Sequence, residues 1–174
     1  IIHVGRMVEQ KNHIRVIEIF NEIYKLRPSS ILLLVGKGDN SIEQQIRRKI
    51  KELNIEENVI LAGTRDDVPR LMESANLLLF PSKWEGLPGV VLEASAVGIP
   101  TLASDIPGIR EIAEWISSVK YMELKCSNYE WAKSALSIID FYKTQTKKSL
   151  KEDFAKSPFK LEKCINELAK VWNQ

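Results

Sequence analysis

The sequence predicts an α/β fold: a Rossmann-like, doubly wound parallel sheet of about six strands with helices on both faces and a helical C-terminal tail. Three observations predict it. Apolar runs of strand length alternate with amphipathic stretches of helical spacing along the 174 residues. The run Ile31–Val35 is apolar at every position, which is typical of a strand buried on both faces of a parallel sheet. Glycine and proline separate the successive units.

Strands and helices are expected to alternate along one domain, residues 1–174, with 125–174 as its helical tail. Strands are predicted at the apolar runs Ile1–Val4, Ile31–Val35, Val59–Ala62, Leu77–Phe80, Thr101–Ala103 and Val119–Met122. Helices are predicted at His13–Leu26, Ser41–Leu53, Asp67–Ala75, Gly89–Ala96 and Pro107–Trp115, and in the tail with breaks near Thr144 and Pro158. Right-handed crossovers then give the sheet order 3-2-1-4-5-6.

Local signals mark the helix ends. In the first helix apolar residues recur at helical spacing until Pro28 ends it. Ser41 is the expected cap of the second helix, and Gln44 completes a capping box. Asp67 is the expected N-cap of the third helix, and Gly98 ends the fourth.

Composition excludes several classes of protein. Lys and Arg number 25 and Asp and Glu 23, so the net charge of +2 gives no electrostatic basis for binding nucleic acid. Hydrophobic residues at 44% and charged residues at 28% indicate an ordinary globular domain. No apolar run approaches the ~18–20 residues of a membrane span. The chain opens inside a predicted strand without an initiator methionine, so we expect a piece of a longer protein.

The histidines and cysteines predict no metal site. His3 and His13, like Cys126 and Cys164, lack the spacing of metal-ligand motifs, so we expect neither a metal nor another cofactor. His3 lies inside the first strand and is expected in the core or at the sheet edge. His13 opens the first helix and is expected to face solvent.

Ligands of doubly wound sheets bind beyond the carboxyl ends of the strands, where the strand order reverses. The loop after the first strand carries Arg6 and Lys11 beside a helix N-terminus, which suits a diphosphate; two solvated surface cations are an equally good interpretation. The loop Gly36–Ser41 satisfies neither the P-loop pattern nor the dinucleotide fingerprint. Gly38 there indicates close approach of a ligand or of backbone, or an ordinary turn.

The strongest signal follows the fourth strand, at the predicted switch point. The segment Pro81–Ala94 contains two carboxylates, Glu85 in a loop and Glu93 about one turn into a helix. Because the neighbours of Glu93 are apolar, we expect a buried carboxylate, which needs a partner such as a ribose diol. The competing interpretation is structural: a salt-bridged glutamate beside a capped loop.

The segment PSKWEGLPGVVLEA resembles the E-x7-E signature of the retaining glycosyltransferases of family 4, which have the GT-B fold. The match continues in register through VGRMVEQKN, LLLVGKGD, VILAGTRDDVPRLMESANLLLFPS and EASAVGIPTLASDIPGIREI. It corresponds to the C-terminal, donor-binding domain of these enzymes. Within the family, the sequence resembles the enzymes of bacterial capsular and exopolysaccharide synthesis.

The resemblance implies a role for each matching residue. Arg6 and Lys11 would contact the diphosphate of the donor. Glu85, the catalytic position, would contact donor-sugar hydroxyls near the reaction centre, and Glu93 would bind the ribose hydroxyls. The remaining candidate donor-binding positions are Gly38, Thr64, Arg65, Gly86, Leu87, Gly89 and Val90. Pro88 departs from the family's usual glycine and has no N–H, so one expected amide donor is missing.

The resemblance also implies an activity: retaining transfer of a hexosyl group from a nucleoside diphosphate sugar to an acceptor hydroxyl, without a metal. An N-terminal domain would hold the glycan or lipid-linked acceptor. The implied location is the cytoplasm, with peripheral association at the inner face of the membrane. Two alternatives stay open, a sugar-nucleotide epimerase of the same fold and a non-catalytic nucleotide-sugar-binding module.

Overall fold

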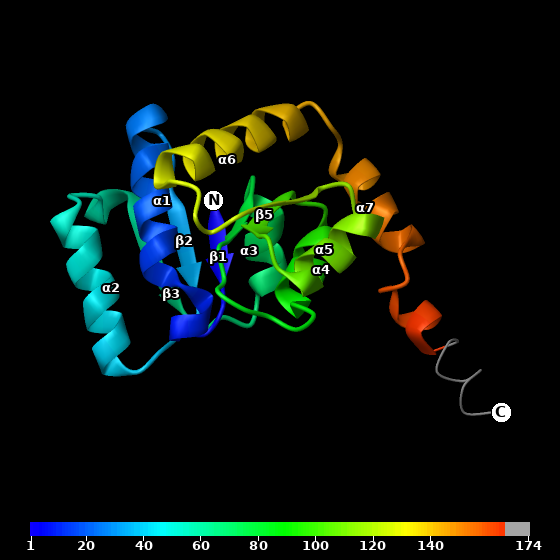
Figure 1. Ribbon diagram of the computed structural model, residues 1–174, viewed down its shortest axis with the longest axis horizontal. Coiled ribbons are helices and arrows are strands. Elements are labelled where there is room, and N and C mark those ends of the chain that lie inside the picture. Colours follow the sequence, from blue (N-terminus) through cyan, green and yellow to red (C-terminus); the bar gives the residue numbers. More distant parts are fainter. Residues whose placement is uncertain (166–174) are drawn as a thin grey trace.

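Six parallel strands form one sheet with helices on both faces (Figure 1). The computed structural model describes residues 1–165. The strands are β1 (Ile2–Val4), β2 (Leu32–Val35), β3 (Val59–Gly63), β4 (Leu78–Phe80), β5 (Thr101–Ser104) and β6 (Val119–Met122). Their order is β3-β2-β1-β4-β5-β6, which confirms the predicted fold class and topology.

Helices connect the strands at the predicted places. They are α1 (His13–Leu26), α2 (Asn40–Glu52), α3 (Val68–Ser74), α4 (Gly89–Val97), α5 (Pro107–Trp115), α6 (Asn128–Tyr142) and α7 (Lys147–Lys156). Two 3-10 turns, η1 (Glu9–Lys11) and η2 (Glu56–Asn58), precede α1 and β3. Apolar periodicity therefore located every strand and α-helix up to β6 closely, but neither 3-10 turn.

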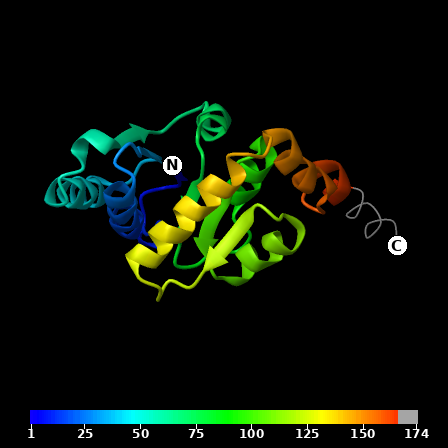
Figure 2. The same cartoon turned by 90° about the horizontal axis from the view of Figure 1, so that it is seen from above.

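Helices cover both faces of the sheet (Figure 2), and a hydrophobic cluster lies on each face. Helices α1, α2 and α6 supply one layer, α3, α4 and α5 supply the other, and α7 packs against α4 and α5. Strand β4 fills both layers: Leu79 packs into the first, while Leu78 and Phe80 pack into the second, and all three are fully buried. This two-sided burial is why the strand is apolar at every position.

The start of the second helix differs from the prediction. Asp39 is the N-cap of α2, and its carboxylate accepts hydrogen bonds from the Ile42 amide at 3.0 Å and the Ser41 hydroxyl at 2.6 Å. The prediction that Ser41 caps this helix is wrong because the carboxylate two residues earlier already takes the free amide. Asp67 does precede α3, but its carboxylate binds Arg65 and provides no side-chain cap.

The C-terminal tail is helical, as predicted, over the residues that the structure describes. α6 and α7 are separated near Thr144, and α7 ends before Pro158, so both predicted breaks are confirmed. The part of the predicted tail at 166–174 lies outside the described residues. Among residues 1–165, no helix is both long enough and apolar enough to cross a bilayer.

Candidate functional site

The loop after β1 (residues 5–12, the first loop) and the loop after β4 (residues 81–88, the signature loop) lie side by side. β1 and β4 are neighbours at the point where the strand order reverses. The Lys83 amide donates to the Gln10 carbonyl at 2.8 Å, and the Gln10 side-chain amide donates to the Trp84 carbonyl at 2.8 Å. Thus, at the predicted switch point, the first loop and the signature loop form one surface and hold each other in place by these hydrogen bonds.

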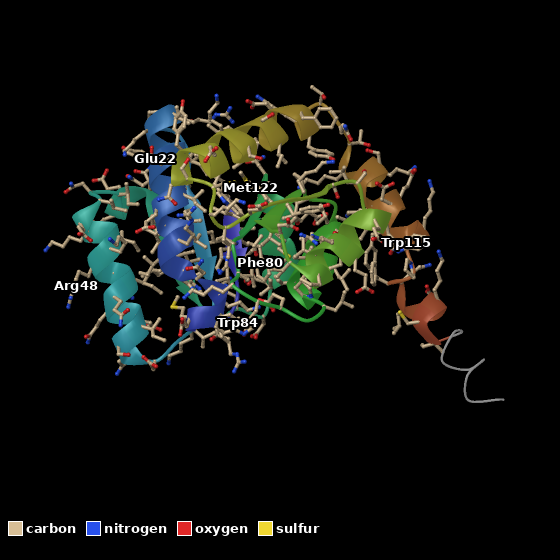
Figure 3. All side chains as sticks on the ribbon, in the orientation of Figure 1. Glu22, Arg48, Phe80, Trp84, Trp115 and Met122 are labelled. Atoms are coloured by element: carbon tan, nitrogen blue, oxygen red, sulfur yellow. The ribbon has the colours of Figure 1, made fainter. Side chains whose placement is uncertain are left out.

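Lys11 of the first loop and Glu85 of the signature loop form an ion pair in this surface. Nζ of Lys11 lies 2.6 Å from Oε1 of Glu85, and the two side chains are 18% and 8% exposed. The ammonium also lies 4.8 Å from the ring centre of Phe80, which is labelled with Trp84 in Figure 3. Low exposure strengthens the attraction between the two charges. It also makes removal of either residue costly, because the other charge would be left without a partner. From the sequence these two residues were expected to contact separate parts of a ligand, and their contact with each other was not predicted.

Glu93 lies on α4 but is exposed, so the expectation of a buried carboxylate is wrong. The buried face of α4 is formed by Val91, Ala94 and Ser95, which leaves Glu93 on the outer side of the helix. Its Oε1 lies 4.0 Å from the position that a Cβ on Gly89 would occupy, so the carboxylate folds back towards the start of α4. Glu93 is therefore accessible to a ligand at the N-terminus of its own helix.

The N-terminus of α4 is available to an anion. Pro88 is the N-cap residue and provides no side-chain cap. Gly86, Leu87 and Gly89 are exposed, and Val90 is half-buried. A Cβ added to Gly86 would meet nothing within 4 Å. Free amides and the positive end of the helix dipole favour negative charge at such a place.

Two other glycines are required by the fold itself. A Cβ on Gly38 would come within 2.6 Å of the Met7 carbonyl oxygen, because the loops after β1 and β2 touch there. A Cβ on Gly108, at the start of α5, would lie 1.7 Å from the carbonyl oxygen of Gly86. Backbone contact therefore explains Gly38, one of the alternatives left open by the sequence, and α5 supports the signature loop through Gly108.

The remaining candidate side chains lie at the edges of this surface. Arg6 is exposed on the first loop. Thr64 and Arg65 are exposed on the loop after β3, the edge strand that β2 separates from β1. The Arg65 guanidinium donates to both oxygens of Asp67, at 2.8 and 2.9 Å, and this hydrogen bonding lowers the pKa of the Asp67 carboxyl. The structure thus brings Lys11 and Glu85 into contact and leaves Thr64 and Arg65 on a separate loop.

The two histidines meet beneath the first loop. Their ring centres are 4.6 Å apart in an edge-to-face arrangement, and His3 Nδ1 hydrogen-bonds the Leu79 carbonyl at 2.8 Å. His13 is only 3% exposed, so the expectation that it faces solvent is wrong: the ring turns inward onto His3. Burial lowers the pKa of His3 to about 3 and that of His13 to about 4, so both are neutral at pH 7. Among residues 1–165, no cluster of three or more histidine, cysteine or acidic side chains is arranged to hold a metal.

Known proteins resemble the chain in sequence. Two relatives are an uncharacterized glycosyltransferase of Methanocaldococcus jannaschii, 32% identical over 112 residues, and the UDP-Gal:α-D-GlcNAc-diphosphoundecaprenol α-1,3-galactosyltransferase of Escherichia coli, 32% identical over 109 residues. The matches cover 64% and 60% of this chain but only 27% of each relative. The chain thus corresponds to a part of these longer proteins.

The fold also matches a solved structure. HepE of Anabaena, crystallised with UDP, superimposes with a TM-score of 0.86 at 21% identity, over 99% of this chain and 48% of that one. The family model described as glycosyl transferases group 1 matches residues 1–155. The chain therefore belongs to the group 1 glycosyltransferases, which confirms the resemblance stated from its sequence.

Proposed function

We propose that this chain is the donor-binding half of a two-domain retaining glycosyltransferase. The enzyme would move a hexosyl group from a nucleoside diphosphate sugar to an acceptor hydroxyl, in the synthesis of a bacterial surface polysaccharide. The observation that carries this proposal is the Lys11–Glu85 pair at the switch point, beside the uncapped N-terminus of α4. A cation, a carboxylate and a free helix N-terminus together suit a diphosphate joined to a polyol.

The donor would lie along the carboxyl edge of the sheet. Its diphosphate would contact Arg6, Lys11 and the first amides of α4. The exposed carboxylate of Glu93 is free to accept both hydroxyl hydrogens of a ribose diol. The base would lie towards the loop of Thr64 and Arg65. The backbone at Gly86, Leu87, Gly89 and Val90 would approach the sugar and phosphates, with Gly38 shaping the neighbouring loop.

The chemistry would rest on positioning and on charge stabilisation. The bond from the anomeric carbon to the leaving phosphate oxygen breaks, and its electron pair stays on the diphosphate. Lys11, Arg6 and the α4 dipole would stabilise that charge, so we propose transfer without a divalent metal. The acceptor oxygen attacks on the same face, and its proton passes to the departing phosphate oxygen. Glu85 would hold donor-sugar hydroxyls and is not assigned as a nucleophile.

The acceptor would be a glycan or a lipid-linked sugar, held by a further domain. A further domain is supported by the length of similar proteins, since this chain matches only 48% of the HepE chain. The E. coli relative acts, by its name, on a sugar carried by diphosphoundecaprenol. A lipid-linked acceptor would place the complete enzyme in the cytoplasm, peripherally at the inner face of the membrane.

Thermal unfolding in the presence of UDP, GDP, ADP, CMP and their sugar conjugates tests the proposal. A ligand at about ten times its dissociation constant stabilises by about 1.4 kcal/mol, a shift of a few degrees. One nucleotide should raise the melting temperature of wild type and of Glu114→Gln, an exposed carboxylate on α5, but much less that of Glu93→Gln. Failure of all nucleotides at millimolar concentration, with this chain and with a version that includes its upstream sequence, would contradict the proposal.

A further inference from the structure

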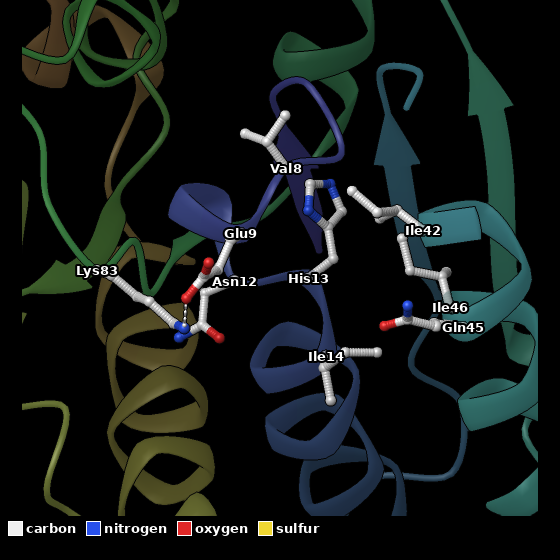
Figure 4. Close-up of a pocket in the computed structure, with 9 residues that line it drawn as sticks. All are labelled: Val8, Glu9, Asn12, His13, Ile14, Ile42, Gln45, Ile46 and Lys83. Carbon is white, nitrogen blue, oxygen red and sulfur yellow. Dashed lines mark hydrogen bonds and ion pairs between the residues drawn. The ribbon is translucent and has the colours of Figure 1, made fainter. Parts of the chain in front are cut away.

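A pocket of about 360 Å³ lies between the N-terminal ends of α1 and α2 (Figure 4). It is lined by Val8, Glu9, Asn12, His13, Ile14, Ile42, Gln45, Ile46 and Lys83. Neither Lys11 nor Glu85 is among its lining residues, and Glu93 is not either. The pocket is therefore distinct from the proposed donor site, although the first loop and the signature loop contribute to both. Its volume is at the lower end of the range for small-molecule sites, about 300–1,000 Å³.

The ring of His13 is a buried polar group that forms part of the wall of this pocket, while its inner side packs against His3. Figure 4 shows the ring between Val8 and Ile42. The side chain is 3% exposed, and neither ring nitrogen has a hydrogen-bond partner among the described residues. Buried polar atoms are nearly always paired, so an unpaired imidazole at a pocket wall indicates a ligand or water that supplies the partner. A neutral imidazole offers one donor and one acceptor, the complement of a hydroxyl group.

The start of α1 adds further free donors. Asn12, its N-cap residue, gives no side-chain cap: its backbone is left-handed (φ 56°) where a capping residue is normally extended, and its side-chain nitrogen donates to the Pro81 carbonyl at 3.0 Å. The first-turn amides of α1 consequently lack the usual side-chain acceptor. A hydroxyl oxygen that enters the pocket beside His13 can accept from such an amide.

The charge of the pocket favours a neutral ligand. Its one lysine, Lys83, and its one glutamate, Glu9, are paired at 2.8 Å and offset each other. The remaining polar lining is His13 and the two amides Asn12 and Gln45. Four aliphatic side chains, Val8, Ile14, Ile42 and Ile46, complete the walls. Aliphatic walls with uncharged hydrogen-bonding groups suit a molecule that has both an apolar face and hydroxyls.

We propose that this pocket is a carbohydrate subsite that binds one neutral pyranose ring of the acceptor or product glycan. The ring would place C–H surface on Ile42 and Ile46 and a hydroxyl against His13. Assignment of the ring to the acceptor rests on the proposed transferase function; binding of a pyranose at His13 does not. A growing polysaccharide would in this way be held by the donor-binding half of the enzyme as well.

NMR of the His13 ring nitrogens in the isotopically labelled chain tests the subsite. The chain has only two histidines, so a His13→Gln spectrum assigns the signals. Methyl α-D-glucopyranoside and methyl β-D-galactopyranoside are the probes. At least one should shift the His13 signals saturably at millimolar concentration, with the same affinity when UDP is present. Because UDP is titrated separately, a failure of the donor site and a failure of this pocket give different results.

Two variants on one helix provide the matched control. Gln45 lines the pocket and Gln44 does not, and both are exposed on α2. Gln45→Trp should fill the pocket and abolish the glycoside-induced shift, whereas Gln44→Trp should retain it. Absence of a saturable shift with both glycosides, an unchanged response in Gln45→Trp, or an equal response to inorganic phosphate would each overturn the inference.

Discussion

Replacement of Glu85 by glutamine is expected to tighten the binding of a free nucleoside diphosphate while abolishing sugar transfer. The Glu85 carboxylate lies 2.6 Å from Nζ of Lys11, on the ammonium that the diphosphate would contact. Binding of the diphosphate must therefore weaken this pair. Glutamine keeps the size of the side chain and removes the competing charge.

The magnitude follows from the geometry of the pair. At 2.6 Å the direct attraction is about 6 kcal/mol for an effective dielectric constant of about 20. Desolvation of both groups offsets most of that attraction. The net value of a hydrogen bond to a charged group is about 1.5–3 kcal/mol. Taking the lower value, because the pair is only partly lost on binding, we expect about a tenfold lower dissociation constant for UDP.

Calorimetric titration of UDP into wild type, Glu85→Gln and Glu9→Gln measures the effect. Glu9 is the matched control, since it is on the first loop, pairs with Lys83 at 2.8 Å and is 77% exposed. Its removal changes the net charge equally and should alter the affinity by about twofold or less. If Glu85→Gln binds UDP no more tightly than Glu9→Gln, the reasoning is refuted. Near-wild-type transfer by Glu85→Gln in the complete enzyme would refute the catalytic assignment.

Three further outcomes are expected. Gly108→Ala should destabilise the chain by about 1–3 kcal/mol, because a Cβ there would lie 1.7 Å from the Gly86 carbonyl oxygen. Gly86→Ala is the control and should melt near wild type, because a Cβ on Gly86 would meet nothing within 4 Å. Equal melting temperatures of the two variants would contradict this prediction. Burial lowers the pKa of His13 from 6.5 to about 4 and that of His3 from 6.5 to about 3, so the unfolded chain binds more protons below pH 6.5. The free energy of unfolding should therefore fall on acidification from about pH 6.5 towards pH 4, by about 1.4 kcal/mol per pH unit for each histidine, and His13→Gln should reduce that slope in urea titrations; an unchanged slope would exclude His13 as a cause. Affinity for UDP should not change when EDTA removes divalent metals, because the proposed binding mode balances the diphosphate charge with the cations of the first loop. A loss of affinity in EDTA would show that a metal takes part.

Much of the fold could be predicted from local pattern. Strands such as β4 are buried on both faces, and that environment leaves an unbroken apolar run in the sequence. Short connections and right-handed crossovers then allow only a few sheet topologies. The observed strand order, β3-β2-β1-β4-β5-β6, is the usual one for doubly wound sheets. The errors concern which side chain takes a given hydrogen bond, as where Asp39 caps α2 in place of Ser41.

The site was less predictable, because it depends on contacts between distant segments. Glu93 has apolar neighbours in sequence, yet helical geometry turns Val91 and Ala94 inward and leaves the carboxylate outside. His13 opens a helix, where exposure is usual, but the tertiary structure supplies His3 as its neighbour. The Lys11–Glu85 contact had one available signal: the predicted adjacency of the first and fourth strands places their loops together.

A crystal structure of the chain with its most stabilising nucleoside diphosphate would test the central claim most directly. We expect the phosphates at Arg6, Lys11 and the N-terminus of α4, and the ribose hydroxyls on Glu93. We also expect the Glu85 carboxylate to have moved away from Lys11. A nucleotide bound elsewhere, for example in the pocket at His13, with the 2.6 Å Lys11–Glu85 pair intact, would contradict the account.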